Sequence, residues 1–302
     1  MVSIDYIIAS YNSASNSYLE ECIKTIRGQK FPEDYKSQII VVDGGSTDNS
    51  VNIATKYGCT VLCNEARTEL SFGGGKNLAV HYSKADIIFI VDADNLLMEE
   101  NYAESMIKPL IEDSQICMTI PMPYVPGKRE YKQVTRYFCC IERDLWEGIA
   151  SSGINIGKWV EVYPHSIIVP NGAAIRRSAL TDIGGYDYDT EVGFRLLSNL
   201  KNKFAIVPTA HRFHIEMESY YDVFWKFKRR LQHQVDHWEE KQVISSQLKS
   251  YFSKPKTFLG TRLRDPMSLF LKKHDTCYLQ VIPVFLIELL LAFFFAKKLY
   301  VL

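Results

Sequence analysis

The sequence predicts an α/β protein built on a mainly parallel sheet with helices on both faces. Two observations lead to this prediction. Short apolar runs alternate with helical stretches through the first hundred residues, and most of these runs end in polar residues rather than in a plain turn. Strands separated by helices of this length form β-α-β units and hence a parallel sheet. Ligands of such sheets bind beyond the carboxyl ends of the strands, so the polar strand ends predict a binding site at that edge.

The same pattern can be followed along the chain. Residues 115–170 are less regular and contain five prolines, which suggests a second half of the same domain with long loops. Residues 220–242 have apolar side chains at steps of three or four with basic residues among them, which predicts an amphipathic basic helix. The expected strands of the first hundred residues are 6–9, 38–42, 60–63 and 87–91, and the expected helices are 18–28, 49–57 and 75–83.

The balance of charge hides an asymmetry between the two parts of the chain. The 302 residues include 35 Lys and Arg and 35 Asp and Glu, so the net charge is zero and a strongly basic nucleic-acid binder is excluded. Residues 1–200 carry 18 basic and 26 acidic side chains, whereas residues 201–302 carry 17 and 9, which gives −8 and +8. The C-terminal third is therefore expected to meet an anionic surface.

The cysteines indicate a reducing compartment. Seven cysteines make an odd count with no C-x-x-C pair, which argues against a disulfide framework and against a structural zinc site. The first residues show no basic leader followed by an apolar run, so no signal peptide is expected. These features together predict a catalytic body in the cytosol.

A mostly apolar run occupies residues 277–296. Its length of about twenty residues is near that needed to cross the hydrocarbon core of a bilayer. Lysine pairs flank the run, and one glutamine, one proline and one glutamate interrupt it. Three interpretations stay open: a membrane-embedded or spanning helix, an interfacial helix, and a buried or oligomer-contact helix. We expect a catalytic domain over residues 1–220 and a helical membrane-association region over residues 221–302.

Two carboxylates lie where a buried strand is expected to emerge from the sheet. Asp92 and Asp94 follow the apolar residues 87–91 directly. Hard divalent cations such as Mg²⁺ favour carboxylate oxygens and keep open positions for phosphate, so the pair predicts a metal–diphosphate site. Such a pair alone also fits a solvated turn. Its position after five apolar residues, beside two other polar strand ends, favours the metal site.

Several short motifs occur in a fixed order along the chain. They are IIASYN at 7–12, VVDGGSTD at 41–48, GKNLA at 75–79, the Asp92 and Asp94 pair, PNGAAIRRS at 170–178 and IGGYD at 183–187. This series resembles the family 2 glycosyltransferases, which have the GT-A fold and use nucleotide-diphospho-sugars. The resemblance extends over roughly residues 3–220, and the ordered series is far more specific than any one motif.

The resemblance implies a nucleotide pocket at the first strand ends. Asp43 is expected to contact the base or ribose, and Ser10 and Asn12 to line the same pocket. Lys76 stands where the family often has Arg before Asn, and its ammonium group is expected to pair with the diphosphate. Asp43 also fits an Asx-turn that caps the next helix, and Lys76 a solvated helix residue. Many members have two consecutive aspartates where this chain has Asp43 alone, so no base selectivity is inferred.

The resemblance also implies a catalytic base shortly before an Arg-Leu pair. Asp189 aligns with the base, a tyrosine replaces the glutamate that precedes it in the family, and Glu191 is the competitor. In an inverting transfer the acceptor hydroxyl loses its proton as it attacks the anomeric carbon, and a nearby carboxylate can accept that proton. Either carboxylate also fits a cap of the helix that follows.

A histidine that contacts metal or diphosphate is the last residue implied by the family. His214 is expected to complete the coordination sphere begun by Asp94, because a neutral imidazole nitrogen is a metal ligand. His211 is the alternative, and a structural role for either histidine stays open. The expected ion is Mg²⁺ or Mn²⁺, held by Asp92, Asp94 and His214, with Asp92 also beside the donor.

Taken together, these features predict a metal-dependent inverting glycosyltransferase at the cytoplasmic face of the cell membrane. Its donor is expected to be a UDP- or GDP-sugar, its acceptor a hydroxyl of a lipid-linked or membrane-proximal glycan, and no nucleic acid is expected as a partner. A polyprenyl-phosphate glycosyl synthase is the alternative enzyme. Its phosphate acceptor is already ionised and needs little base catalysis. A nucleotide-sugar-binding scaffold is the alternative outside the enzymes. Anionic lipid is the expected contact of the basic region, although a solvated face or an RNA or acidic partner also fits.

Overall fold

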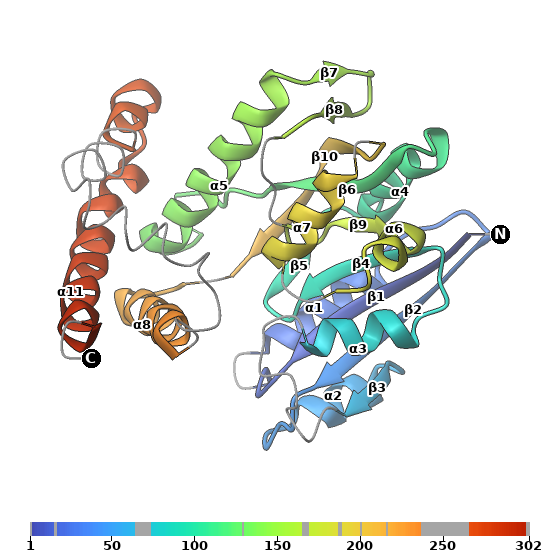
Figure 1. Ribbon diagram of the computed structural model, residues 1–302, viewed down its shortest axis with the longest axis horizontal. Coiled ribbons are helices and arrows are strands. Elements are labelled where there is room, and N and C mark those ends of the chain that lie inside the picture. The colour runs from blue at the N-terminus through green and yellow to red at the C-terminus, as the bar shows by residue number, and fades with distance from the viewer. Residues whose placement is uncertain are drawn as a thin grey trace. The chain divides into compact units, whose positions relative to one another are not determined.

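A computed structural model confirms the α/β architecture (Figure 1). The structure describes residues 2–14, 17–63, 74–128, 130–164, 169–186, 189–199, 201–215, 217–236 and 266–299. The chain divides into two compact units, each made of two segments. The first is Met1–Tyr124 with Arg143–His214, and the second is Val125–Glu142 with Ile215–Leu302.

Strands and helices alternate through the first hundred residues in the predicted order. The strands are β1 (Val2–Ser10), β2 (Tyr35–Asp43), β3 (Thr60–Cys63), β4 (Ile87–Asp92), β5 (Asn95–Leu97), β6 (Ile116–Pro123), β7 (Ile154–Asn155), β8 (Val160–Val162), β9 (Ala174–Arg176) and β10 (Lys203–His214). The helices are α1 (Tyr18–Arg27), α2 (Ser50–Lys56), α3 (Gly74–Tyr82), α4 (Tyr102–Glu112), α5 (Gln133–Ser151), α6 (Arg177–Asp182), α7 (Asp189–Ser198), α8 (Tyr220–Asp236), the 3₁₀ helix η1 (Thr276–Gln280) and α11 (Val281–Leu299).

The sheet of the first unit is mainly parallel, as predicted. Its strand order is β3-β2-β1-β4-β9-β6-β10-β8-β7, and β5 pairs with the end of β10. Strands β1 to β4 are parallel to one another, as are β6 and β10, whereas β9 runs antiparallel between β4 and β6. In this register Ser10 is opposite Asp43, and Ala9 is opposite Asp92. The polar ends of β1, β2 and β4 therefore meet at one edge.

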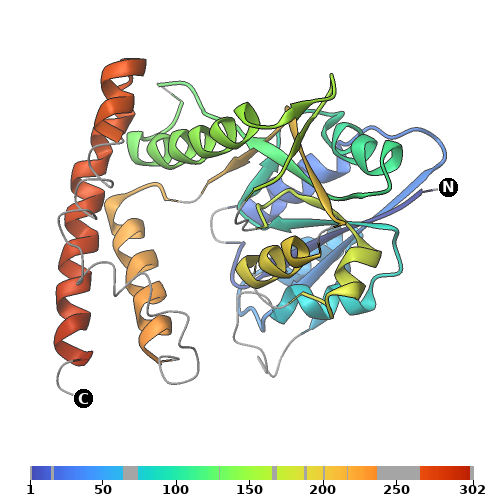
Figure 2. The same cartoon turned by 45° about the horizontal axis from the view of Figure 1, so that its top comes forward.

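The two faces of the sheet are buried by different helices. Ile4, Tyr6 and Ile8 of β1 pack with α1, α2 and α4, whereas Ile7 lies in the cluster formed with α3, α6 and α7. Figure 2 shows the teal α3 and the yellow α6 and α7 on one side of the sheet. Successive side chains of a strand point to opposite faces, so a central strand covered on both sides is apolar nearly throughout.

Residues 115–170 are more regular than expected. They contain the 19-residue helix α5, whose amphipathic pattern the sequence analysis did not identify. Pro121 and Pro123 lie within β6 instead of in loops. Proline has no N–H for a sheet hydrogen bond, and the pairing of β6 with β10 is irregular here, with a register shift after the pair Pro121 and Val207.

The second unit is helical. Its core includes Val134 and Tyr137 of α5, Val223 of α8, and Val281 and Val284 of α11. The C-terminal segment of this unit begins at residue 215, whereas the sequence predicts a boundary after residue 220. The unit also includes the first part of α5.

The expected apolar C-terminal helix is present as η1 followed by α11. Pro283 lies in the first turn of α11, where an absent N–H breaks no helical hydrogen bond. Over the described residues, no helix is both long enough and apolar enough to cross a membrane.

Candidate active site

Two buried polar atoms lie at the ends of β1 and β2. Ser10 and Asp43 are 5% and 4% exposed, and within the described residues neither Ser10 Oγ nor Asp43 Oδ1 has a hydrogen-bond partner. Leaving a buried polar group unsatisfied costs roughly 1–3 kcal/mol, so a polar ligand that bonds to these atoms recovers that energy. Asp43 Oδ2 accepts from the backbone N–H groups of Gly45 and Ser46 at 2.9 and 2.8 Å. One oxygen of Asp43 thus forms the Asx-turn, and the other is left for a ligand.

Asn12 joins the two loops that follow these strands. Its Oδ1 accepts from the Thr47 backbone N–H at 2.8 Å, and its own N–H donates to Ser46 Oγ at 2.8 Å. Its φ of 49° is in the left-handed region, which asparagine adopts more readily than most residues. The structure therefore gives Asn12 a role in fixing the loops that follow β1 and β2, and its lining of a nucleotide pocket stays a prediction.

Lys76 is buried at the start of α3. It is 2% exposed, its Nζ lies 3.1 Å from Asp92 Oδ1, and it is 5.7 Å from the ring centroid of Tyr186. The interpretation of Lys76 as a solvated helix residue is therefore wrong. A buried ammonium group is tolerated only when an opposite charge or hydrogen-bond acceptors compensate for lost water. Asp92 supplies that charge.

Asp94 lies beside His214. Asp94 Oδ2 is 3.3 Å from His214 Nε2, and Asp94 Oδ1 accepts from Asn95 Nδ2 at 2.8 Å. The antiparallel pairing of β5 with β10 places Asn95 opposite His214. Asp94, the residue before Asn95, is thereby brought close to the His214 side chain. Asn95 is fully buried and fixes the orientation of the carboxylate.

His211 has a different partner. Its Nδ1 is 2.7 Å from Glu99 Oε1, and its backbone N–H donates to Glu99 Oε2 at 2.8 Å. Of the two histidines considered from the sequence, the structure therefore brings His214 to Asp94 and pairs His211 with Glu99.

The start of α7 is anchored to α3. Asn77 Oδ1 accepts from the backbone N–H of Tyr186 at 2.9 Å, and Tyr186 is fully buried. Asp189 begins α7 three residues later, a backbone reach of at most about 10 Å. Asp189 and Glu191 both lie in the first turn of α7, but their side chains are outside the described part of the structure.

The side chains of Asp94 and His214 offer donor atoms that fit a divalent metal ion. Asp94 and His214 offer one carboxylate oxygen and one imidazole nitrogen, a mixed set that suits a first-row transition ion such as Mn²⁺. Asp92, the third expected ligand, contacts Lys76 instead. Asp94 and His214 would therefore hold the ion, while Asp92 pairs with Lys76.

Three residues that shape the site were not selected from the sequence. Asn95 orients Asp94, Asn77 holds the segment before α7, and Tyr186 packs against Lys76. Asn77 and Tyr186 lie within two of the ordered motifs, so their position was a signal. Nothing in those motifs indicated that the two residues touch each other.

A mainly parallel sheet with helices on both faces, and with polar strand ends gathered at one edge, is the architecture of the GT-A glycosyltransferases. The chain belongs to glycosyl transferase family 2, because the profile of that family matches residues 5–184.

Two curated relatives illustrate the family. Over 108 residues the chain is 28% identical to TarS of Staphylococcus aureus, a poly(ribitol-phosphate) β-N-acetylglucosaminyltransferase, covering 35% of this chain and 18% of TarS. Over 214 residues it is 25% identical to glycosyltransferase GlyG of Streptococcus pneumoniae, covering 68% of this chain and 67% of GlyG. The chain thus matches less than a fifth of TarS and about two thirds of GlyG.

Solved structures share the fold. A mannosyltransferase of Pyrobaculum calidifontis, in complex with GDP-Man and Mn²⁺, matches with a TM-score of 0.58 at 15% identity, over 95% of this chain and 86% of that one. Residues 1–349 of TarS, in complex with UDP-GlcNAc, match with a TM-score of 0.51 at 16% identity, over 86% and 75% of the two chains. At these identities the likeness establishes the fold.

Substituting Asp43 by Asn tests the unsatisfied carboxylate oxygen. An asparagine side chain keeps one oxygen for the turn at Gly45 and Ser46, but it places an NH₂ donor where Asp43 Oδ1 was. We expect nucleoside diphosphate affinity, measured by calorimetry, to fall roughly tenfold to a hundredfold with a nearly unchanged melting temperature.

Asp48→Asn is the matched control for that substitution. Asp48 lies in the same loop as Asp43, and both of its carboxylate oxygens already accept hydrogen bonds. Oδ1 accepts from Ser50, and Oδ2 accepts from the backbone N–H of Ala14. This variant should melt earlier but bind the nucleotide as the wild type does. Equal affinities for wild type and Asp43→Asn would show that Asp43 Oδ1 does not meet the nucleotide.

Proposed function

We propose that this protein transfers a sugar, with inversion, from a nucleoside diphosphate donor to an acceptor hydroxyl. The observation that supports this most directly is the shared edge of the sheet. There the unsatisfied atom of Ser10 lies on the strand next to that of Asp92, and the unsatisfied atom of Asp43 lies one strand further along. Base and ribose hydroxyls would bond to the first two residues, and the diphosphate would extend towards Asp94 and His214.

Divalent metal is part of the proposal, and the donor set favours Mn²⁺ over Mg²⁺. Mg²⁺ prefers an all-oxygen octahedral shell, whereas an imidazole nitrogen is a good ligand for the transition series. When bound, the ion would neutralise charge on the departing diphosphate, which is the main electrostatic demand of the reaction. The Mn²⁺ in the mannosyltransferase of similar fold supports the choice.

The remaining chemistry belongs to the first turn of α7. As the acceptor oxygen attacks the anomeric carbon, the bond from that carbon to the diphosphate oxygen breaks on the opposite side. The hydroxyl proton passes to the Asp189 carboxylate, with Glu191 as the competing base. The hydrogen bond from Tyr186 N–H to Asn77 supports this assignment, because it holds the approach to α7 beside the Lys76 and Asp92 pair.

The acceptor is a hydroxyl in this proposal rather than an ionised phosphate. TarS, by its name, glycosylates poly(ribitol phosphate), a polymer that offers hydroxyl groups. A polyprenyl-phosphate glycosyl synthase remains the second candidate because the second unit has an exposed apolar surface, described below. An ionised phosphate needs no base, and so the two functions differ in their dependence on Asp189.

Asp189→Asn separates the two candidates. With a hydroxyl acceptor, kcat should fall by about 10²-fold or more, the usual contribution of a positioned general base. Donor affinity should not change, because the substitution leaves the nucleotide edge intact. Glu191→Gln is the matched control and should retain most activity. The polyprenyl-phosphate glycosyl synthase would be correct on two results together. Asp189→Asn would lose little activity with a lipid phosphate acceptor, and the wild type would not use hydroxyl acceptors.

We also propose that the second unit docks the enzyme on an anionic bilayer next to a lipid-linked acceptor. On α11 the exposed side chains Ile282, Leu286, Leu289 and Leu290 follow helical spacing and share one face. On α8, Tyr221 and Trp225 are exposed four residues apart, and Lys228 Nζ lies 4.3 Å from the Trp225 ring centroid. Apolar and aromatic side chains bordered by basic groups are typical of interfacial helices.

Charge complementarity supports the same occupant. Residues 201–302 carry a balance of +8, and each basic residue near an anionic surface contributes about 1 kcal/mol of attraction. A polyanion such as RNA would match the charge but would leave the leucine face of α11 in water. The bilayer satisfies both features, in keeping with location at the cytoplasmic face of the membrane.

Co-sedimentation of the full chain with phosphatidylglycerol vesicles tests the docking surface. The double variant Leu286→Ser, Leu290→Ser should bind at least tenfold more weakly, because burying one leucine contributes roughly 1.5–3 kcal/mol. Leu145→Ser removes a comparably exposed leucine from the first unit and should bind normally. Undiminished binding by the double variant, with activity on a short soluble acceptor also unchanged, would refute docking through α11.

A further inference from the structure

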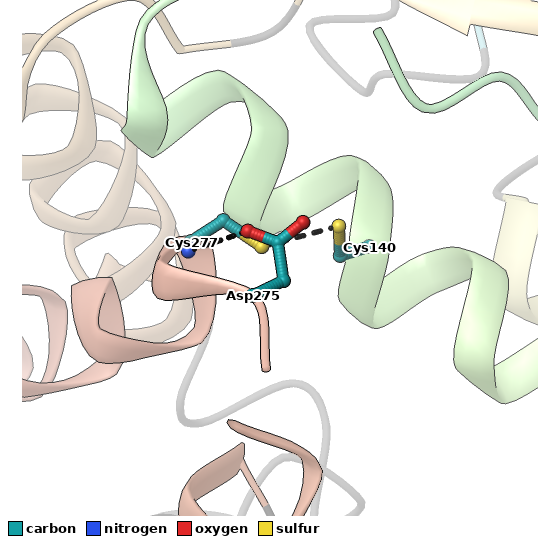
Figure 3. A group of neighbouring side chains, drawn as sticks. All are labelled: Cys140, Asp275 and Cys277. Atoms are coloured by element: carbon teal, nitrogen blue, oxygen red, sulfur yellow. Dashed lines mark hydrogen bonds between the residues drawn. The ribbon is translucent and has the colours of Figure 1, made fainter. Parts of the chain in front are cut away.

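A second cluster of reactive side chains lies in the helical unit. Cys140 of α5, Cys277 of η1 and Asp275, which precedes η1, place ligand-type atoms within 4.8 Å of one another (Figure 3). The two sulfur atoms are 3.3 Å apart, and Cys277 Sγ–H donates to Cys140 Sγ. Cys140 is 6% exposed and Cys277 is fully buried. These sulfurs come from residues 137 positions apart in the sequence.

The carboxylate of this cluster is already occupied. Asp275 Oδ2 accepts from Arg136 Nη2 at 2.8 Å, and Asp275 Oδ1 accepts from Arg136 Nη1 at 3.2 Å and from the Cys277 N–H at 3.0 Å. The same Arg136 contact lowers the pKa of Asp275 well below its usual range. A metal ion here would compete with a buried guanidinium cation for the same oxygens. Structural zinc also takes four ligands, and the described residues supply three.

We propose that Cys140 and Cys277 are a dithiol pair that peroxide converts reversibly into a disulfide. The sulfurs need to approach by only about 1.3 Å to reach bonding distance. The bond to Cys140 and burial raise the pKa of the Cys277 thiol, so Cys277 rests as a thiol. This inference does not depend on the proposed transfer reaction, because neither cysteine belongs to the sheet edge.

The reaction is balanced by hydrogen peroxide alone. Cys140 is the less buried residue, and its sulfur attacks one peroxide oxygen. The O–O bond breaks, the thiol proton joins the displaced hydroxide as water, and Cys140 becomes a sulfenic acid. The Cys277 sulfur then displaces the sulfenic oxygen, which leaves as a second water, and the S–S bond forms. Two thiols and one peroxide become one disulfide and two waters. Dithiothreitol returns the two electrons and restores the thiols.

The bond would join α5 to η1 and thereby hold the start of α11 against α5. Val134 and Tyr137 of α5 already pack with Val281 and Val284 of α11. A covalent link across so long a loop strongly restricts the unfolded chain. Oxidation is therefore expected to stabilise the helical unit without altering its packing.

Peptide mass spectrometry of the full-length protein tests the pair. The protein is treated with hydrogen peroxide at a dose that oxidises the exposed Cys63, and its remaining thiols are then blocked. We expect a Cys140–Cys277 cross-linked peptide, two hydrogens lighter than the sum of its parts, that dithiothreitol removes. The melting temperature should rise by roughly 5 °C. Recovery of Cys140 and Cys277 as free thiols after Cys63 has reacted would overturn the proposal.

Cys139→Ser provides a matched control, because Cys139 is the buried neighbour of Cys140 on the same helix. This variant should keep the cross-link and the thermal shift, whereas Cys140→Ser and Cys277→Ser should lose both. A link from Cys139 would contradict the proposal. Native mass spectrometry of the reduced wild type provides a second check. Binding of one Zn²⁺ per chain that is lost in Cys140→Ser would also contradict the proposal. The wild-type peptide map decides the question even if a serine variant does not fold.

Discussion

The site depends on the contact between the buried Lys76 ammonium and the Asp92 carboxylate. An ammonium group that has lost its water must have a negative partner, and at 3.1 Å the Asp92 oxygen provides one. This pairing joins α3 to the end of β4. It commits Asp92 to the protein and leaves Asp94, two residues later, to turn towards His214. The two aspartates therefore have different partners, because Lys76 contacts Asp92 and His214 contacts Asp94.

The residue after Lys76 extends that constraint to the segment that precedes α7. Asn77 holds the backbone of Tyr186, and α7 begins three residues beyond it. One turn of α3 therefore fixes both the Asp92 carboxylate and the segment that leads to Asp189, the proposed base. Gly185, directly before Tyr186, allows the close contact, because a Cβ there would lie 2.7 Å from Asn77 Oδ1 and φ is +104°. Only glycine fits that position without strain.

Much of this arrangement could be predicted from the sequence. The alternation of apolar runs and helices predicted the parallel sheet, and the polar residues at the ends of β1, β2 and β4 predicted that these strand ends meet at one edge. Periodicity could not predict the burial of Lys76, because a lysine at a helix start is usually solvated, and its partner Asp92 comes from another element. Nor did the sequence reveal α5, since the prolines before it suggested loops. The Cys140 and Cys277 contact joins residues 137 apart, and no local pattern encodes it.

The central claim is that Asp94 and His214 hold a divalent ion that binds the donor's diphosphate, and calorimetry tests it directly. Binding of UDP and GDP is measured with and without Mn²⁺, for the wild type and for His214→Ala. We expect Mn²⁺ to strengthen wild-type binding of at least one of the two nucleotides by at least tenfold, or about 1.4 kcal/mol. His214→Ala should lose most of this gain. An equal gain in both proteins, or no gain in the wild type, would contradict it.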